Sequence, residues 1–305
     1  MRVFVTGASG HIGSALVPEL LAAGHKVVGL ARSDSSAAAL ASAGVEVCRG
    51  SLDDLEGLKA AAAAAEGVIH LAFKHDLAFT GNFAAAVTAD LSATEAMGAA
   101  LEGSGKPFVA TSGTLSLAFA TRGRAGIEED DGGGPRMVSE NAAIALGKRG
   151  VRASAIRLAP TVHSVLDHHG FVPSLVAMAR KNGFAAYVGD GANRWPAVHT
   201  LDAARLYRLA LEAAPAGSRL HGVADEGIPF RELAEAIGRG LGLRAVSIAA
   251  EEAGKHLGFL AAFAQLDNLT SSARTRELLR WQPTHPGLLA DLAERHYFQA
   301  SPAAM

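Results

Sequence analysis

The first thirteen residues constrain this chain most, because a short apolar run passes there through a glycine-rich turn into a helical pattern. Residues 3–5 form a run of the length that a buried strand needs, and apolar residues recur at helical spacing over 14–21. The glycines between them follow the spacing Gly7-x-x-Gly10-x-x-Gly13. Glycine there allows a tight turn, the approach of a pyrophosphate to the backbone, and close packing of helix on strand. The N–H groups at the helix start would face the phosphates, so the segment predicts a dinucleotide-binding turn.

Apolar runs and helical patterns alternate up to about residue 158, which indicates an α/β fold with a parallel sheet wound on both faces. Further strands are expected at 25–31, 45–48, 67–72, 107–113 and 153–158, with helices at 35–43, 55–65, 83–101 and 136–148 between them. From residue 159 the rhythm changes to loops rich in His, Gly and aromatics, with later helices ending near 212, at 230–241 and at 288–297.

Composition excludes several classes of protein. The chain has 305 residues, of which 49% are hydrophobic, and a net charge of −2, so neither nucleic acid nor an anionic membrane surface is expected as a partner. A single cysteine, Cys48, rules out an intramolecular disulfide. No apolar run approaches the length of a membrane span, and a strand starts too early to leave room for a signal peptide. We therefore expect a cytoplasmic protein that acts on a small molecule.

The segment Thr6-Gly7-Ala8-Ser9-Gly10-His11-Ile12-Gly13 resembles the short-chain dehydrogenase/reductase superfamily, and more narrowly its extended or atypical branch, the NAD-dependent epimerase/dehydratase-like proteins. The resemblance implies a nicotinamide cofactor on a Rossmann doubly wound sheet and a smaller C-terminal substrate lobe. On this basis residues 1–158, with roughly 198–222, form the dinucleotide-binding domain. Residues 159–197 and 223–305 form the substrate-binding lobe.

The second strand ends in Arg32-Ser33, where a nucleotide fold meets the adenosine ribose. An acidic residue there would bind the ribose hydroxyls of NAD and repel a phosphate. The guanidinium of Arg32 could instead bind a 2′-phosphate through two parallel hydrogen bonds, with the Ser33 hydroxyl beside it. The sequence therefore favours NADP(H) over NAD(H), the alternative being that Arg32 is a solvated surface charge.

The resemblance also implies further cofactor contacts. In the extended family the residues after the third strand meet the adenine, which here are Ser51 and Leu52, although Ser51 departs from the usual Asp. For Asp53 or Asp54 we favour a helix N-cap. The complete predicted cofactor set is Gly7, Ser9, Gly10, His11, Ile12, Gly13, Arg32, Ser33, Ser51, Leu52, Leu71, Ala72, Phe73, Arg136, Leu158 and Thr161.

The catalytic pattern of the superfamily, a Ser followed by Tyr-x-x-x-Lys, is only partly present. Ser112 matches the Ser and is expected to polarise a substrate oxygen. Glu140 and Arg157 hold the family register, which puts Gly132 at the Tyr position and Arg136 at the Lys position. Arg is no proton donor near neutral pH, so the usual relay is missing. The residues proposed as substitutes are Lys74, His75, His163 and Tyr187.

The lobe offers candidate substrate residues in Phe171, Arg194 and Trp195, with Arg194 available to pair a substrate anion. The neighbouring His168 and His169 do not predict a metal site, because no Cys or carboxylate cluster completes a ligand shell. For His199 and Asp202 a structural role is preferred. The Ala-rich helix at 83–101 would permit the close packing of a homodimer.

The function favoured by the sequence is an NADPH-dependent reductase of a small carbonyl-type substrate. Two alternatives stay open. One is a nucleotide-sugar epimerase or dehydratase, which the missing tyrosine disfavours because those reactions begin by oxidising a hydroxyl and need a base. The other is a non-catalytic regulator that binds NADP(H) and acts through partners.

Overall fold

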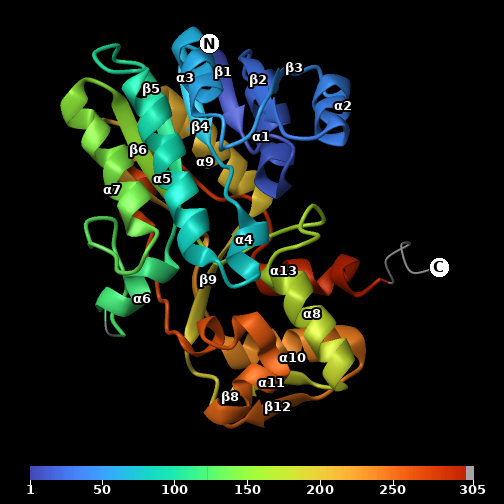
Figure 1. Ribbon diagram of the computed structural model, residues 1–305. Coiled ribbons are helices and arrows are strands. Elements are labelled where there is room, and N and C mark those ends of the chain that lie inside the picture. Colours follow the sequence, from blue (N-terminus) through green and yellow to red (C-terminus); the bar gives the residue numbers. More distant parts are fainter. Residues whose placement is uncertain (122, 300–305) are drawn as a thin grey trace.

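A central parallel sheet with helices on both faces forms the upper part of the molecule, and a smaller lobe lies below it (Figure 1). The computed structural model describes residues 1–121 and 123–299. In the described chain the main sheet has seven strands in the order β10-β6-β5-β4-β1-β2-β3. They are β1 (Arg2–Thr6), β2 (Lys26–Ala31), β3 (Glu46–Arg49), β4 (Gly67–His70), β5 (Pro107–Gly113), β6 (Arg152–Leu158) and β10 (Ser218–Gly222). The predicted doubly wound α/β sheet is confirmed.

The two faces of the sheet are buried by different helices, which is why its strands read as continuous apolar runs. Val3 and Val5 contribute to the core on the side of α1 and α9, whereas Phe4 packs with the core on the side of α3, α5 and α7. The helices of this part are α1 (His11–Ala22), α2 (Asp34–Ser42), α3 (Leu55–Ala64), α4 (His75–Phe79), α5 (Phe83–Ala99), α6 (Leu115–Thr121), α7 (Met137–Ala145) and α9 (Thr200–Ala213), with the 3-10 turn η1 (Leu146–Arg149) after α7.

The lobe contains a three-stranded and a two-stranded sheet covered by helices. The first has β7 (Thr161–His163), β9 (Arg194–His199) and β11 (Asp225–Pro229), and the second has β8 (Ala185–Val188) and β12 (Ala245–Ile248). The helices are α8 (Phe171–Asn182), α10 (Phe230–Leu241), α11 (Ala253–Leu257) and α13 (Leu288–Ala293), with the 3-10 turns η2 (Ala250–Glu252), η3 (Gly258–Leu260), η4 (Phe263–Gln265) and η5 (His296–Phe298). The helix α12 (Ala273–Leu279) packs instead against β10 and α9 of the main part.

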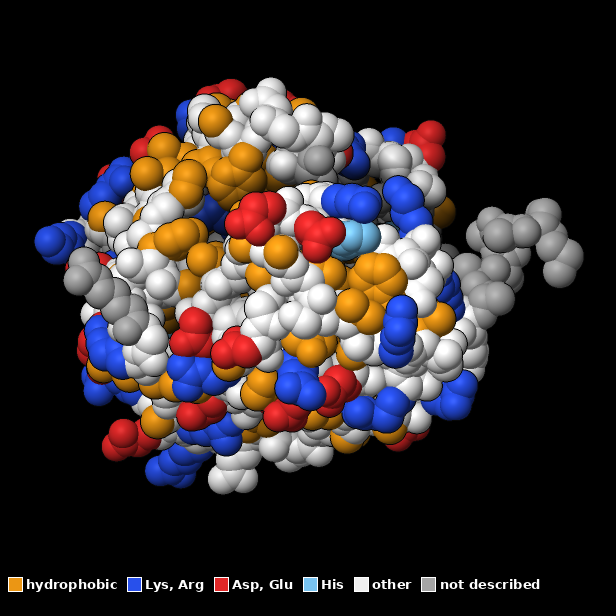
Figure 2. Space-filling view, turned by 90° about the horizontal axis from the view of Figure 1, so that it is seen from below, with side chains coloured by type: hydrophobic (Ala, Val, Ile, Leu, Met, Phe, Trp, Pro, Cys, Tyr) orange, Lys and Arg blue, Asp and Glu red, His pale blue; other side chains and the backbone are white. Residues whose placement is uncertain are grey.

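Two details depart from the expected layout. Leu279 and Trp281 pack in the core of the main sheet, although their segment was expected in the lobe. The predicted last helix, 288–297, ends at Ala293 because Arg295 adopts a left-handed backbone conformation (φ 66°), and η5 follows it. Seen from the lobe side, acidic and basic side chains are interspersed (Figure 2). Across the described residues, every helix is too short or too polar to cross a membrane.

Candidate functional site

The glycine turn after β1 admits no side chains at its two closest contacts. Gly7 has φ 71°, and a Cβ on it would lie 2.8 Å from the backbone nitrogen of Ala72. A Cβ on Gly13 would lie 2.2 Å from the Gly7 carbonyl oxygen. The helix α1 begins directly after Gly10, and no side chain caps its first turn. This backbone cradle at a helix N-terminus has the geometry in which backbone N–H groups bind phosphates, and the diphosphate contact itself stays a prediction.

A buried hydrogen-bond chain aligns the end of β4 with this turn. The Thr6 hydroxyl accepts from the backbone N–H of Ala72 (3.2 Å) and contacts His70 Nδ1 (2.6 Å). His70 Nε2 lies 3.4 Å from a carboxylate oxygen of the buried Asp90 on α5. The predicted contact segment 71–73 is consequently held beside the glycine turn, half-buried at the carboxyl edge of the sheet.

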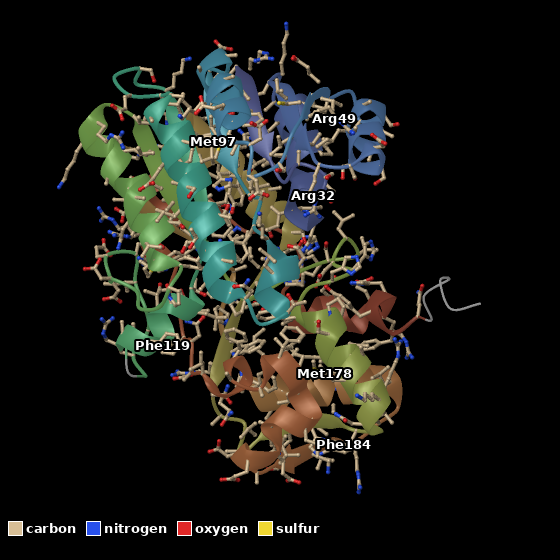
Figure 3. All side chains as sticks on the ribbon, in the orientation of Figure 1. Arg32, Arg49, Met97, Phe119, Met178 and Phe184 are labelled. Carbon is tan, nitrogen blue, oxygen red and sulfur yellow. The ribbon has the colours of Figure 1, made fainter. Side chains whose placement is uncertain are left out.

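Basic residues gather at the adenosine end, beyond β2 and β3 (Figure 3). The exposed Arg32 lies 3.5 Å from the Asp76 carboxylate of α4. Ser33 caps α2 with its hydroxyl. Arg49 donates to the Ser33 carbonyl (2.7 Å) and pairs with Asp34. Arg32 thus keeps an accessible cationic group at the tip of β2.

The next turn, after β3, contains the predicted adenine contacts. Leu52 is buried against the core, and the Ser51 hydroxyl accepts from the backbone N–H of Asp53 (3.2 Å). Asp54, rather than Asp53, caps α3. The Asp53 carboxylate instead binds Lys74 Nζ (2.5 and 2.7 Å), so this lysine is committed to an ion pair at the surface.

A cationic side chain occupies the end of the site where the resemblance places the nicotinamide. The Arg136 guanidinium lies 4.1 Å from the centre of the Phe73 ring, and its Nη2 donates to the Thr111 carbonyl (3.3 Å). Its Nε is buried without a hydrogen-bond partner among the described residues. His75 packs edge-on against Phe73, and burial followed by the Arg136 charge lowers its pKa, although the side chain keeps an accessible surface. Arg136 therefore supplies positive charge at the family's Lys position.

Ser112 lies at the end of β5, beside a buried ion-pair network. Burial would raise the pKa of Glu140, but Arg157, which donates to both carboxylate oxygens (2.6 to 3.1 Å), lowers it, with help from Ser112 and Arg219. The Ser112 hydroxyl is buried and, within the described chain, makes no hydrogen bond of regular geometry. The Glu140–Arg157 contact thus fixes α7 against β6, and the Ser112 hydroxyl lies beside the Glu140 carboxylate at the end of β5.

Gly132, at the Tyr position of the family register, has no room for a side chain. A Cβ there would lie 2.6 Å from Ser116 Oγ and 2.8 Å from Met137 Sδ. The Ser116 hydroxyl in turn donates to the Gly113 carbonyl (2.9 Å). The Ser116 side chain therefore lies directly beside Gly132, the residue at the family's tyrosine position.

Two of the four proposed proton donors lie where they could not serve. His163 is wholly buried, with Nδ1 2.9 Å from the Asp291 carboxylate. Tyr187 lies on β8 in the lower part of the lobe, 5.8 Å from the Arg231 guanidinium (Figure 1). The structure corrects both predictions, because the His163 ring is committed to Asp291 of α13 and β8 is remote from the glycine turn. Lys74 is held by Asp53, which leaves His75 near Phe73 and Arg136.

The three predicted substrate residues make their contacts with other residues of the lobe. Trp195 is fully buried and donates its indole N–H to the Phe263 carbonyl (3.2 Å), so it forms lobe core and not a pocket wall. Phe171 packs against both rings. Arg194 pairs with Asp267 through two contacts (2.9 and 2.6 Å), which neutralises the charge intended for a substrate anion. The sequence did not reveal this partner, 73 positions away.

Two predicted cofactor residues, at the end of β6 and in β7, are also buried. The Leu158 carbonyl accepts from the backbone N–H of Thr114 (2.9 Å), and the Thr161 hydroxyl donates to the Pro196 carbonyl (2.6 Å). Thr161 Oγ1 is thereby engaged at the junction of β7 with β9. His199 caps α9, and the Asp202 carboxylate accepts from the backbone N–H groups of residues 284 and 285, so both act structurally.

His11, in contrast, lies at the centre of contacts that its sequence position did not suggest. Its Nε2 contacts the Thr200 hydroxyl (2.9 Å), and its Nδ1 lies 3.8 Å from Asp167 Oδ1. Burial lowers the pKa of His11 to about 4 and raises the pKa of Asp167 to about 6. The two groups are therefore not an ion pair at neutral pH in the free chain. No local motif marks Asp167, because the lobe brings it to the turn from a segment far along the chain.

The cavity and the groove of the lobe do not coincide with the candidate cofactor site. A cavity of about 10 Å³ lies between α8 and α10, room for one water at most. An open groove of about 190 Å³ lies between α10 and α13. Neither is lined by a residue of the glycine turn or of the edge near Arg136. The candidate site therefore rests on the geometry of the sheet edge.

The fold and the glycine turn define a Rossmann-type dinucleotide-binding protein with an appended lobe. Residues 3–124 match the model of the NAD dependent epimerase/dehydratase family. An uncharacterised protein of Schizosaccharomyces pombe is 46% identical over 301 residues, covering 98% of this chain and all of the relative. One of Saccharomyces cerevisiae is 45% identical, covering 96% and 98%. The chain belongs to the NAD-dependent epimerase/dehydratase family.

Solved structures share this fold at low sequence identity. The dTDP-glucose 4,6-dehydratase of Streptomyces venezuelae, solved with NAD, superimposes with a TM-score of 0.76 at 20% identity and covers 97% of this chain and 96% of its own. The UDP-glucose 4-epimerase of Thermus thermophilus, also with NAD, gives a TM-score of 0.75 at 21% identity over 99% and 100%. At this identity the likeness concerns the fold.

Proposed function

We propose that this chain is an NADP(H)-dependent oxidoreductase that reduces a small carbonyl-type substrate. The observation that carries the proposal is a pair of buried polar groups near the carboxyl end of β5. Arg136 Nε lacks a hydrogen-bond partner within the described chain, and Ser112 Oγ makes no hydrogen bond of regular geometry there, although it lies close enough to Glu140 to lower the pKa of that carboxyl group. Buried polar groups are normally paired, and unpaired ones are expected where a ligand supplies the partner.

The sheet edge offers each part of a dinucleotide a matching group. The backbone of the glycine turn and the start of α1 would hold the diphosphate. Arg32 would bind a 2′-phosphate through its guanidinium, after exchanging the weak contact with Asp76. Arg136, stacked on Phe73, would hold the nicotinamide ribose. The bound cofactor supplies the hydride.

The remaining residues act on the substrate oxygen. The Ser112 hydroxyl would donate a hydrogen bond to it, and the Arg136 charge would stabilise the negative charge that develops there. His75 is the proton donor we propose, because its ring packs on Phe73 within reach of the Arg136 charge. A neutral imidazole N–H can donate to an oxyanion that is more basic than itself.

Gly132 favours a second candidate, a non-catalytic regulator that binds NADP(H). The chain has Gly132 where the family register places the tyrosine, so the standard proton relay is absent, and a Cβ at Gly132 would lie 2.6 Å from Ser116 Oγ. A nucleotide-sugar epimerase or dehydratase, as the solved relatives are described, ranks below both because it needs a base to start the oxidation.

The decisive test measures binding and turnover together. NADPH and NADH are titrated against the protein, and NADPH absorbance is followed with a panel of aldehydes, ketones and enones. We expect Arg32→Ala to weaken NADPH binding about 10-fold or more and to leave NADH binding nearly unchanged. Ser112→Ala should lower kcat/KM about 100-fold.

Ser154→Ala is the matched control, because its hydroxyl is also buried without a partner in the described chain but lies in the interior of β6. It should leave turnover unchanged. Tight NADPH binding without turnover on any panel member would favour the regulator, and binding of neither nucleotide would refute both.

We further propose a cytoplasmic enzyme and a homodimer through α5. Cell fractionation tests the first, and light scattering of the purified chain tests the second.

A further inference from the structure

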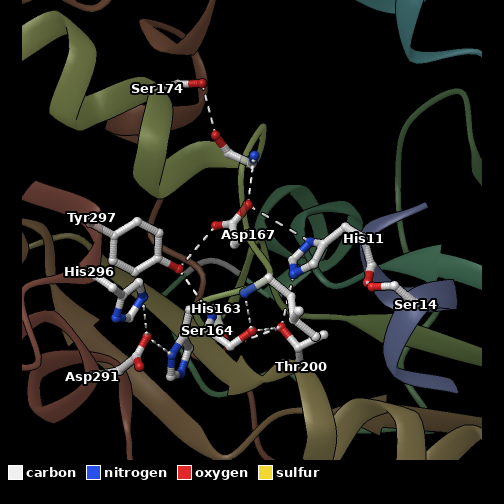
Figure 4. A network of polar contacts seen from close by, with 12 residues as sticks. His11, Ser14, His163, Ser164, Asp167, Ser174, Thr200, Asp291, His296 and Tyr297 are labelled. Carbon is white, nitrogen blue, oxygen red and sulfur yellow. Dashed lines mark hydrogen bonds and ion pairs between the residues drawn. The ribbon is translucent and has the colours of Figure 1, made fainter. Parts of the chain in front are cut away.

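Figure 4 shows a polar network that joins the glycine turn to three other parts of the chain. His11 comes from the turn and Thr200 from the start of α9. Asp167 comes from the loop between β7 and α8, and Tyr297 from η5. None of the cofactor or substrate roles proposed above uses the His11 side chain. The network is therefore a separate feature at the boundary of turn and lobe.

The hydrogen bonds of Thr200 determine which His11 nitrogen carries the proton. The Thr200 hydroxyl donates its only hydrogen to the His163 carbonyl (3.1 Å) and accepts from Ser164 Oγ (2.9 Å). Its contact with His11 Nε2 (2.9 Å) must then be donated by the imidazole. Neutral His11 consequently carries its hydrogen on Nε2, and its Nδ1 lone pair points toward Asp167 Oδ1, 3.8 Å away.

Asp167 is held firmly in this position. It is buried, Oδ1 accepts from the backbone N–H of Gly170 (2.8 Å), and Oδ2 accepts from the Tyr297 hydroxyl (3.2 Å). An ionised carboxylate facing a nitrogen lone pair is repulsive. A single proton on either atom would turn the contact into a hydrogen bond or an ion pair, so the two groups form a site for one proton.

Other ionisable groups surround this site. His163 of β7 and the exposed His168 and His169 face His11 and disfavour its charged form. Beyond Tyr297, Asp291 of α13 lies 3.6 Å from His296. Burial lowers the pKa of His11 to about 4 and raises that of Asp167 to about 6, so the pair is mostly without its proton at pH 7 in the free chain.

We propose that binding of a dinucleotide diphosphate at the glycine turn makes the His11–Asp167 pair take up one proton from solvent. The proposal rests on the proposed function, which brings the diphosphate to this turn. Its negative charges, adjacent to His11, favour the protonated form of the pair. The proton then strengthens the contact between His11 and the loop of Asp167. Cofactor binding in this way tightens the junction between turn and lobe.

Calorimetry counts the protons. NADPH is titrated into the protein at pH 7 in phosphate and in Tris, whose ionisation enthalpies differ, and the difference in binding heat gives the protons exchanged. We expect the proton uptake of the wild type to exceed that of Asp167→Asn and of His11→Gln by roughly half a proton or more. Each substitution keeps a polar partner for its neighbours, Gly170 and Thr200, and is checked by thermal melting. Proton changes on the nucleotide itself cancel in the comparison.

One control substitution isolates the pair. His25→Gln changes a buried histidine that contacts Glu212, away from the turn, and should keep the wild-type proton count. Loss of uptake in this control, or an unchanged count in Asp167→Asn and His11→Gln, would overturn the proposal while NADPH still binds. Absence of binding heat and of any nucleotide-induced rise in melting temperature would overturn the proposed function as well. An upward shift of the His11 titration by NMR when NADPH is added is the second expected readout.

Discussion

The buried carboxyl group of Asp167 should make the stability of the free protein depend on pH in a defined way. Burial raises its pKa from 3.8, the ordinary value, to about 6. At a pH between these two pKa values, Asp167 is therefore protonated in the native state and ionised in the unfolded chain. The resulting stabilisation is complete below pH 3.8 and is lost as the pH rises through 6. The difference in pKa contributes about 3 kcal/mol to the free energy of unfolding at low pH. Of this contribution, about 2 kcal/mol is lost between about pH 4.5 and pH 7.5.

Asp167→Asn removes this titration. The free energy of unfolding of the variant, minus that of the wild type, should rise by about 2 kcal/mol from about pH 4.5 to pH 7.5. Any constant effect of the altered contact with Tyr297 cancels in this slope. Urea unfolding followed by tryptophan fluorescence provides the measurement, because Trp195 and Trp281 are both fully buried.

Exposed Asp190 is the matched control, and Asp190→Asn should follow the wild type at every pH. If the free energy of unfolding of Asp167→Asn, minus that of the wild type, stays constant or falls as the pH rises, burial does not raise the pKa of Asp167 and the reasoning is refuted. His11 does not mask the effect, because burial lowers its pKa to about 4 and leaves the imidazole neutral over most of the range.

Three further predictions concern the site and its supports. Gly13→Ala places a Cβ 2.2 Å from a backbone oxygen, so NADPH binding measured by calorimetry should be lost. The free energy of unfolding, measured in urea, should fall by about 1–3 kcal/mol. Glu140→Gln breaks the buried pair with Arg157 and should cost about 3–5 kcal/mol in the same assay, whereas a cost below about 1 kcal/mol would show that the arginine finds another partner. Ser112→Ala removes a buried hydroxyl that makes no hydrogen bond of regular geometry, so the melting temperature should hold or rise while turnover falls, and a clear loss of stability would show that its contact with Glu140 is a structural hydrogen bond.

The sequence was sufficient for the sheet and for the glycine turn after β1, since both depend on local patterns. Apolar runs and glycine spacing within a few residues determined β1, the turn and α1, whereas the register between Glu140 and Arg157 came from the family resemblance, and the structure pairs these two residues. The absence of a tyrosine at Gly132 was equally visible in the sequence. These features required no knowledge of distant contacts.

Tertiary structure alone decided which polar side chains remain available. Arg194, His163 and Lys74 looked like free chemical groups in the sequence, and each is paired with a carboxylate from a segment distant in the chain. His11 looked like a backbone contact only, and docking of the lobe gave it Asp167 as a neighbour. A side chain's chemistry depends on burial and on its partners, which come from any part of the chain. Local sequence therefore specifies where the backbone turns, and the packing of distant segments determines which charges and protons are left for a ligand.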